Sequence, residues 1–155
     1  MTQTAQTLST DATAQIAEAL NQCVAETAVT TLAQNFHWNV TGMAFGPLHD
    51  LFQKIYEDHF VAQDDLAERI KALDAHAEGT LSGMLKRSKV SEVDGVPGAE
   101  EMIRLMKDAQ ETLAETIAGA GELAAGHGDT LTEDLCIARG QTHEKFAWML
   151  RAHLS

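Results

Sequence analysis

The sequence is poor in the residues that interrupt helices and in those that build disulfide frameworks. It contains only 2 prolines and 2 cysteines in 155 residues, while alanine, leucine, glutamate and glutamine are plentiful. That composition favours helix over sheet. Two cysteines, Cys23 and Cys136, are too few for a disulfide scaffold and lie among apolar residues. We therefore expect two buried thiols.

Basic residues are absent from the first part of the chain. No Lys or Arg precedes Lys54, and the formal net charge is -12. DNA repels such a surface unless a basic patch offsets it, and the one basic cluster, Lys86, Arg87 and Lys89, is short. We expect no DNA binding at ordinary salt and cations as partners. The sequence also lacks a membrane-spanning apolar run and a signal-peptide pattern, so we expect a cytoplasmic protein with no membrane contact.

Apolar residues recur at helical spacing in four long segments. Every fourth residue from Ile16 to Phe36 is apolar, which predicts a helix capped by Thr10 or Asp11 and ending near Val40. Similar patterns predict helices over about 47–73, about 99–125 and from about 132 nearly to the end.

The connection between the second and third predicted helices is long. Residues 74–98 contain four glycines and a proline, which predicts a crossover with a short helix near 82–87. The whole pattern predicts an all-α protein with a ferritin-like four-helix bundle over residues 11–155. We expect residues 1–10 to form a mobile segment.

Two histidines and two carboxylates are candidates for a metal site. His37 lies at the end of the first predicted helix, and His49 lies at the start of the second. Asp64 and Glu68 are four residues apart, so they share one face of the second helix. This mixture of nitrogen and oxygen ligands suits iron, manganese or zinc. Alternatively, the two acids belong to a solvated charged helix face, balanced by basic residues at 69 and 71.

The spacing of these residues has a consequence for assembly. In a straight helix His49 and Asp64 are about 22 Å apart, so one chain cannot bring both to one metal. If they act together, the carboxylates must come from a second subunit, through a two-fold pairing of antiparallel second helices. The axis would cross near residues 57–60, which makes Tyr56 and Phe60 interface residues. The single-chain di-iron pattern is missing, because none of the 7 histidines has Glu three residues before it.

Several motifs resemble those of the Dps family, also called mini-ferritins. The resemblance rests on Asn-Phe-His-Trp-Asn-Val-Thr-Gly at 35–42, Pro-Leu-His-Asp-Leu-Phe at 47–52 and Asp-Asp-Leu-Ala-Glu-Arg-Ile at 64–70. It extends to His-Glu-Lys at 143–145 and Trp-Met-Leu-Arg at 148–151. It covers nearly the whole chain after the first ten residues.

The resemblance implies a hollow homo-dodecamer with tetrahedral symmetry that acts as a ferroxidase. Such proteins oxidise Fe(II), usually preferring hydrogen peroxide to oxygen, and store ferric iron inside the cage, which protects against oxidative stress. It implies His37 and His49 of one subunit as iron ligands, with Asp64 and Glu68 of its two-fold partner. It also implies an acidic three-fold pore, for which Asp129 and Asp134 are candidates, and a location in the cytoplasm or at the nucleoid.

One usual ligand position departs from the family pattern. The family commonly has Asp one turn after the second histidine, and this chain has Gln53. A neutral amide supplies no charge, so we expect one tightly bound iron per site and a weaker second one, with Glu57 as a possible substitute. The alternative is a structural or DNA-protecting cage in which the ferroxidase site is weakened.

Overall fold

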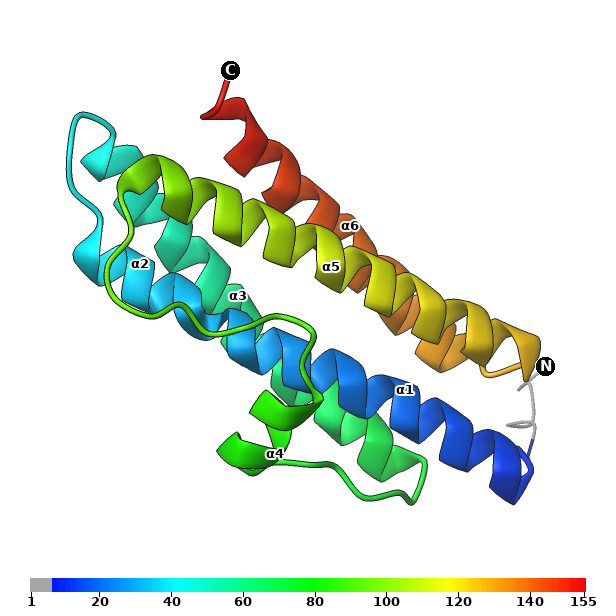
Figure 1. Ribbon diagram of the computed structural model, residues 1–155. Coiled ribbons are helices and arrows are strands. Elements are labelled where there is room, and N and C mark those ends of the chain that lie inside the picture. The colour runs from blue at the N-terminus through cyan, green and yellow to red at the C-terminus, as the bar shows by residue number, and fades with distance from the viewer. Residues whose placement is uncertain (1–6) are drawn as a thin grey trace.

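The structure, a computed structural model, describes residues 7–155 and is helical with no strand in that range (Figure 1). The first long segment consists of α1 (Thr10–Val29), a 3-10 turn η1 (Thr30–Leu32) and α2 (Ala33–Asn39). The others are α3 (Phe45–Ala72), the short α4 (Leu81–Arg87), α5 (Ala99–Gly126) and α6 (Thr130–Ala152). The prediction of four long helices with a short helix in the central connection is confirmed.

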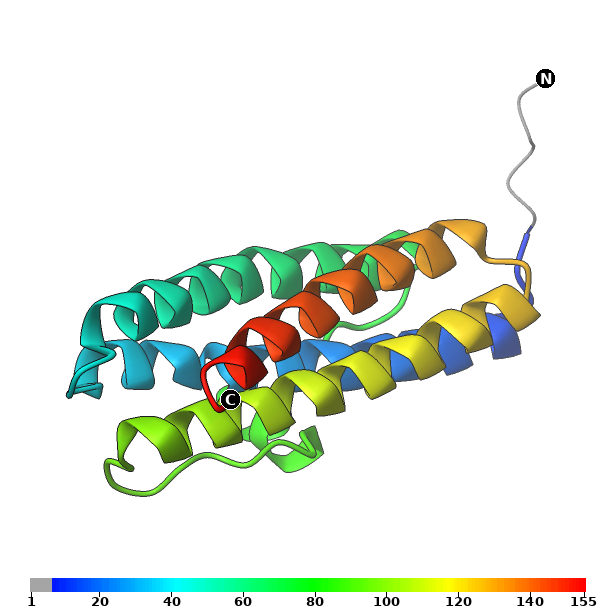
Figure 2. The same ribbon diagram turned by 90° about the horizontal axis from the view of Figure 1, so that it is seen from above.

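The helices form an elongated four-helix bundle. The α1–α2 segment lies against α3, and α5 lies against α6, as both views show (Figures 1 and 2). The chain between α3 and α5 crosses the outside of the bundle and carries α4, which packs on α1. Of the predicted mobile segment 1–10, residues 1–6 lie outside the described residues, and Thr10 already belongs to α1.

The first helix differs from its prediction in two details. Its N-cap is Ser9, not Thr10 or Asp11, because the Ser9 hydroxyl accepts a hydrogen bond from the Ala12 amide at 3.1 Å. The predicted single helix is interrupted at residues 30–32, where the Thr30 and Thr31 hydroxyls donate to the carbonyls of Thr27 and Ala28. Threonine hydroxyls that bond three residues back compete with the helical pattern and tighten the turn.

The apolar core has two clusters, one toward each end of the bundle. One is centred on side chains such as Phe36, Phe52 and Met106. The other contains Leu20, Leu66 and Ile117 together with Cys23 and Cys136. Both thiols are buried and free, as expected, and burial raises the pKa of Cys136 to about 11. Between residues 7 and 155 no helix is long and apolar enough to cross a membrane.

Candidate functional site

His37 and His49 form a stacked pair where α2 and α3 meet. Their ring centroids are 3.7 Å apart, with an angle of 19° between the planes. Each ring is held by the main chain of the other residue: His37 Nδ1 lies 2.7 Å from the His49 carbonyl oxygen, and His49 Nδ1 lies 2.8 Å from the His37 carbonyl oxygen. A carbonyl only accepts, so both Nδ1 atoms must carry the proton and donate.

This reciprocal arrangement leaves two nitrogen lone pairs available. With Nδ1 protonated, Nε2 of each neutral ring is unprotonated, and neither Nε2 has a hydrogen-bond partner within the described part of the chain. Tyr56 packs edge-on against His37 at 5.3 Å, and Phe45 stacks on His49 at 5.0 Å. A fixed tautomer with free Nε2 is the state in which histidine binds a transition metal.

Gln53 lies one helical turn after His49 and is half-buried. Its amide nitrogen donates to Oε1 of Glu57 at 2.8 Å. The Gln53 carbonyl oxygen is therefore its remaining polar atom able to accept a bond or bind a cation. Glu57 is exposed, and this hydrogen bond joins the side chains of Gln53 and Glu57 on one side of α3.

Asp64 and Glu68 lie on the same helix as His49 and are exposed. Because α3 is unbroken from Phe45 to Ala72, His49 and Asp64 are about 22 Å apart along it. Within residues 7–155 no group of three or more His, Cys, Asp or Glu side chains is placed to hold a metal. One chain therefore presents its imidazoles and its two carboxylates as separate halves, and any site that uses all four needs two chains.

The basic residues beside these carboxylates are engaged elsewhere. Arg69 donates to Asp129 at 2.9 Å and to the Thr132 hydroxyl at 2.8 Å. Lys71 donates to the carbonyl of Ala75 at 2.7 Å. In the described chain no ion pair is formed by Asp64 or Glu68. Neither basic residue therefore forms an ion pair with Asp64 or Glu68, as the alternative of a charge-balanced helix face would require.

The middle of α3 borders an apolar groove opposite α4. The groove has a volume of about 600 Å³, and its lining includes Tyr56, Phe60, Val61, Leu81 and Met84. Phe60 is 70% exposed and Leu81 is 78% exposed. Large apolar side chains exposed together mark an interaction surface. The predicted interface residues Tyr56 and Phe60 thus lie in one groove, midway between the two halves of the candidate site.

The two acids predicted to line a pore have different surroundings. Asp129 is 6% exposed and caps α6, accepting from the Thr132 amide at 3.1 Å and from Arg69. Burial raises its pKa, but the bonds from Thr132 and Arg69 outweigh burial and keep the pKa low. Asp134 is exposed. Asp129 is thus committed inside its own chain, and only Asp134 presents a free carboxylate.

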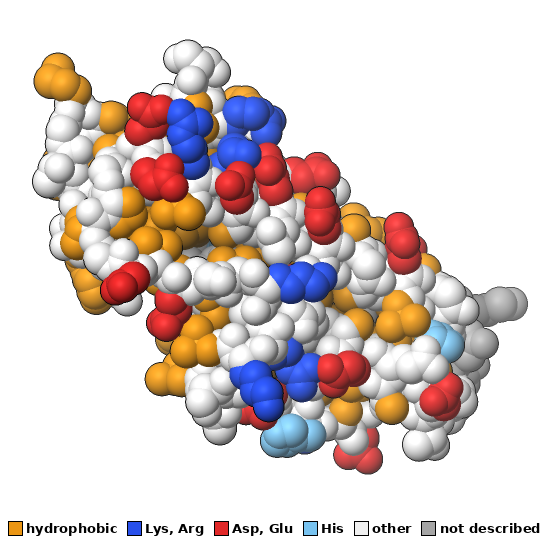
Figure 3. Space-filling view, viewed as in Figure 1, with side chains coloured by type: hydrophobic (Ala, Val, Ile, Leu, Met, Phe, Trp, Pro, Cys, Tyr) orange, Lys and Arg blue, Asp and Glu red, His pale blue; other side chains and the backbone are white. Residues whose placement is uncertain are grey.

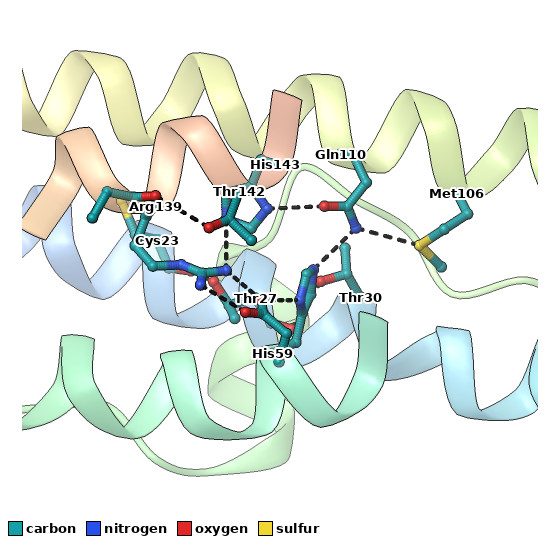
Figure 4. A network of polar contacts seen from close by, with 11 residues as sticks. Cys23, Thr27, Thr30, His59, Met106, Gln110, Arg139, Thr142 and His143 are labelled. Carbon is teal, nitrogen blue, oxygen red and sulfur yellow. Dashed lines mark hydrogen bonds and ion pairs between the residues drawn. The ribbon is translucent and has the colours of Figure 1, made fainter. Parts of the chain in front are cut away.

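A second histidine pair in the bundle interior was not singled out from the sequence. His59 and His143 are 0% exposed and are joined through Gln110 (Figure 4). Burial lowers the pKa of His143 to about 2, and burial also lowers the pKa of His59. The available signal was polar residues at inward positions of α3, α5 and α6, among them Gln110 between the core residues Met106 and Leu113.

Comparison with known proteins gives consistent relatives. The Ferritin family model, described as a ferritin-like domain, matches residues 16–155. The chain is 37% identical over 143 residues to DNA protection during starvation protein 2 of Bacillus anthracis, covering 91% of this chain and 97% of that protein. It is 36% identical over 141 residues to General stress protein 20U of Bacillus subtilis, covering 90% and 97%.

Solved structures agree with these relatives. The Dps protein of Vibrio cholerae O1, described as a member of a broad superfamily of ferritin-like diiron-carboxylate proteins, superposes with a TM-score of 0.92. It is 31% identical, and the match covers 100% of this chain and 98% of that one. Dps from Bacillus brevis, at 31% identity and a TM-score of 0.91, covers 96% of this chain and 100% of that one.

Proposed function

Because the chain belongs to the Dps family of ferritin-like proteins, we propose that it is a mini-ferritin that oxidises Fe(II) and stores the ferric product. The oxidation takes place at sites shared by two subunits, with hydrogen peroxide as the preferred oxidant. The subunits form a hollow dodecamer in the cytoplasm. The observation that carries the proposal is the stacked pair His37 and His49 with both Nε2 atoms free.

The ligand set combines two half-sites. His37 and His49 of one subunit bind Fe(II) through Nε2, and Asp64 and Glu68 of a second copy supply two negative charges. Imidazole suits Fe(II), and the carboxylates favour the harder Fe(III) product. The main-chain bonds to Nδ1 orient both rings before iron arrives, so binding costs little rearrangement.

The oxidation requires two electrons. Hydrogen peroxide accepts one electron from each of two Fe(II) ions and, with two protons, is converted to two waters. With Gln53 at a usual carboxylate position, each site has two formal anionic ligands. We therefore expect one iron to bind tightly and the second weakly, with the Gln53 carbonyl oxygen as its neutral ligand.

The two-fold pairing places a second copy in the groove around Tyr56 and Phe60. This groove lies on α3 midway between His49 and Glu68, which is where antiparallel α3 helices must cross if each carboxylate pair is to reach the other chain's imidazoles. Burial of the exposed Phe60 and Leu81 side chains would stabilise this pairing.

Negative potential brings Fe(II) to the assembly. The net charge of -12 per chain attracts cations and opposes DNA. On the face seen in Figure 3, Lys and Arg side chains are interspersed with Asp and Glu and form no continuous basic stripe. Asp134 is the carboxylate that we assign to the pore, since Asp129 is held by Arg69.

The neutral Gln53 at a usual carboxylate position favours one alternative function. This alternative is a cage whose ferroxidase site has been weakened and whose role is structural or DNA-protecting.

One experiment distinguishes the two functions. Anaerobic Fe(II) is mixed in stopped flow with hydrogen peroxide, and separately with oxygen, while absorbance of the Fe(III) product is followed. We expect a fast phase with peroxide that is lost in His49→Ala. A wild-type protein no faster than His49→Ala would leave the structural cage as the better description.

A further inference from the structure

Five residues close a ring of hydrogen bonds between the two apolar clusters. Asp58 and His59 come from α3, Gln110 from α5, and Arg139 and His143 from α6. Figure 4 shows His59, Gln110, His143 and Arg139 pointing toward one another across the bundle interior. The ring joins α3 to the α5–α6 pair in a region where apolar packing is interrupted.

The contacts follow one another around the ring. His59 Nδ1 lies 3.1 Å from Asp58 Oδ2, and His59 Nε2 lies 3.0 Å from Gln110 Nε2. Gln110 Oε1 lies 2.9 Å from His143 Nδ1, and His143 Nε2 lies 3.3 Å from Arg139 Nη2. Arg139 closes the ring by donating to both Asp58 oxygens, at 3.1 and 2.7 Å.

Only one placement of protons satisfies all of these contacts. Arg139 only donates, so Nε2 of His143 must accept, and its Nδ1 must then donate to Gln110 Oε1. The Gln110 amide nitrogen therefore faces His59 and donates to it, and it also lies 3.5 Å from Met106 Sδ. His59 accepts at Nε2 and donates from Nδ1 to the Asp58 carboxylate. Both imidazoles are neutral in this arrangement.

A further proton cannot be added without breaking the ring. On His143 the proton would face the Arg139 guanidinium. On His59 it would face the Gln110 amide, and turning that amide only moves the donor–donor conflict to His143 and then to Arg139. We propose that this ring is a pH-sensitive lock, which holds α3 against α5 and α6 only while both imidazoles stay neutral.

The charges around the two imidazoles support this behaviour. Asp58 and Arg139 act in opposite directions on each imidazole, and a charge on His59 would also lower the pKa of His143. In Figure 4 the residues labelled from the other packed elements are Gln110 and Met106 of α5, Cys23 and Thr27 of α1 and Thr30 of η1. None of them is charged, since burial raises the pKa of the Cys23 thiol. Burial of both rings outweighs the attraction of Asp58 and lowers both pKa values.

The lock weakens in acid. Both folded-state pKa values lie below the ordinary value of 6.5 that the unfolded chain retains. Above that pH neither state binds the extra protons, and the full stability is present. Below it the unfolded chain binds two protons that the closed ring excludes, so the opening equilibrium rises by up to about 100-fold per pH unit.

The first test reads the protons directly in the wild-type assembly. Protein labelled with ¹⁵N-histidine is sedimented and studied by solid-state NMR at pH 7.5 and pH 5.0, with His59→Gln and His143→Gln used for assignment. We expect both rings to keep a protonated Nδ1 and an unprotonated Nε2 at pH 5.0. A charged ring, or a protonated Nε2, at either buried position would overturn the proposal.

The second test changes the proton count of the ring. In Gln110→Glu the carboxylate accepts hydrogen bonds from both imidazoles, so His59 must carry a second proton. The closed network of the variant then holds one more proton near neutral pH than that of the wild type, and opening it in acid takes up fewer additional protons. Hydrogen exchange of the α3 amides near residue 59 should then rise much less between pH 6.5 and 5.0 than in the wild type, after correction for intrinsic exchange. Gln141→Glu, the same change on the exposed side of α6, should follow the wild type.

A Gln110→Glu profile parallel to the wild type would contradict the lock, and if this variant fails to fold the NMR measurement decides. Neither experiment involves iron, so the lock can fail while the proposed ferroxidase function stands, and the reverse.

Discussion

The two histidine pairs of this protein differ in what occupies their ring nitrogens. His37 and His49 each use one nitrogen on a main-chain carbonyl and keep the other free. His59 and His143 use both nitrogens on partners inside the bundle. A buried ring needs a partner for every polar atom, because an unpaired one costs about 1–3 kcal/mol. The pair near the subunit surface can leave Nε2 open for a partner that arrives later.

The comparison bears on where we propose that iron binds in this bundle. Other ferritin-like proteins can hold two metals at the bundle centre through carboxylates and histidines on facing helices. Here a hydrogen-bonded ring occupies the interior, and the nitrogens of both of its imidazoles are already engaged by partners within the bundle. The free imidazole nitrogens lie instead where α2 meets α3.

Removing one imidazole of the outer pair, His37 and His49, should have the largest effect on the rate of Fe(II) oxidation. His37→Ala deletes a proposed iron ligand and also removes the hydrogen bond that the His49 carbonyl accepts from His37. Loss of an outer-shell partner alone costs about 10–100-fold, so we expect the peroxide-driven oxidation rate to fall by more than about 100-fold. Stopped-flow absorbance measures the rate, and His153→Ala, an exposed histidine, is the control. A rate within a factor of about three of wild type would exclude His37 as a ligand.

Removing one imidazole of the inner pair, His59 and His143, should instead lower the free energy of unfolding. His59→Ala leaves a cavity and takes away the partners of Asp58 and Gln110, so we expect a loss of about 2–4 kcal/mol. Thermal unfolding at pH 7.5 checks this, while the folded assembly should retain peroxide-driven oxidation. A His59→Ala variant that is as stable as the wild type but does not oxidise Fe(II) would contradict the roles assigned to the two histidine pairs.

Restoring the missing carboxylate should sharpen the outer site. Gln53→Asp adds a third anionic ligand, and we expect the affinity for the second iron to rise by about 10-fold, or about 1.4 kcal/mol. Anaerobic calorimetric titration with Fe(II) measures both sites. Gln53→Asn, which has the same size without the charge, is the matched control. Two equally tight irons in the wild type would contradict the expected weakness.

We expect the protein not to bind DNA. The net charge of -12 opposes a polyanion, and Arg87 of the one basic cluster is paired with Glu18. In a gel-shift assay at moderate ionic strength we expect free DNA at every protein concentration tested. Retained DNA would favour the DNA-protecting cage.

Much of the architecture could be predicted from the sequence. Apolar spacing places the long helices to within a few residues, because a buried stripe at helical period leaves little choice of secondary structure. The interruption at Thr30–Leu32 was missed, since the hydroxyl bonds of Thr30 and Thr31 depend on local geometry rather than on apolar period. The separation of His49 and Asp64 also follows from helix length alone, once α3 is unbroken.

Only the tertiary structure decided how each polar residue is used. The candidate ligands His37 and His49 stand out in sequence motifs, but their stacking and fixed tautomers depend on how the chain turns between α2 and α3. Asp129 looked like a pore acid, and Arg69 from a distant part of the chain engages it. His59, Gln110 and His143 lie far apart in sequence and meet only when three helices pack. Hydrogen bonds act between neighbours in space, so apolar period can predict the helices but not the proton positions between them.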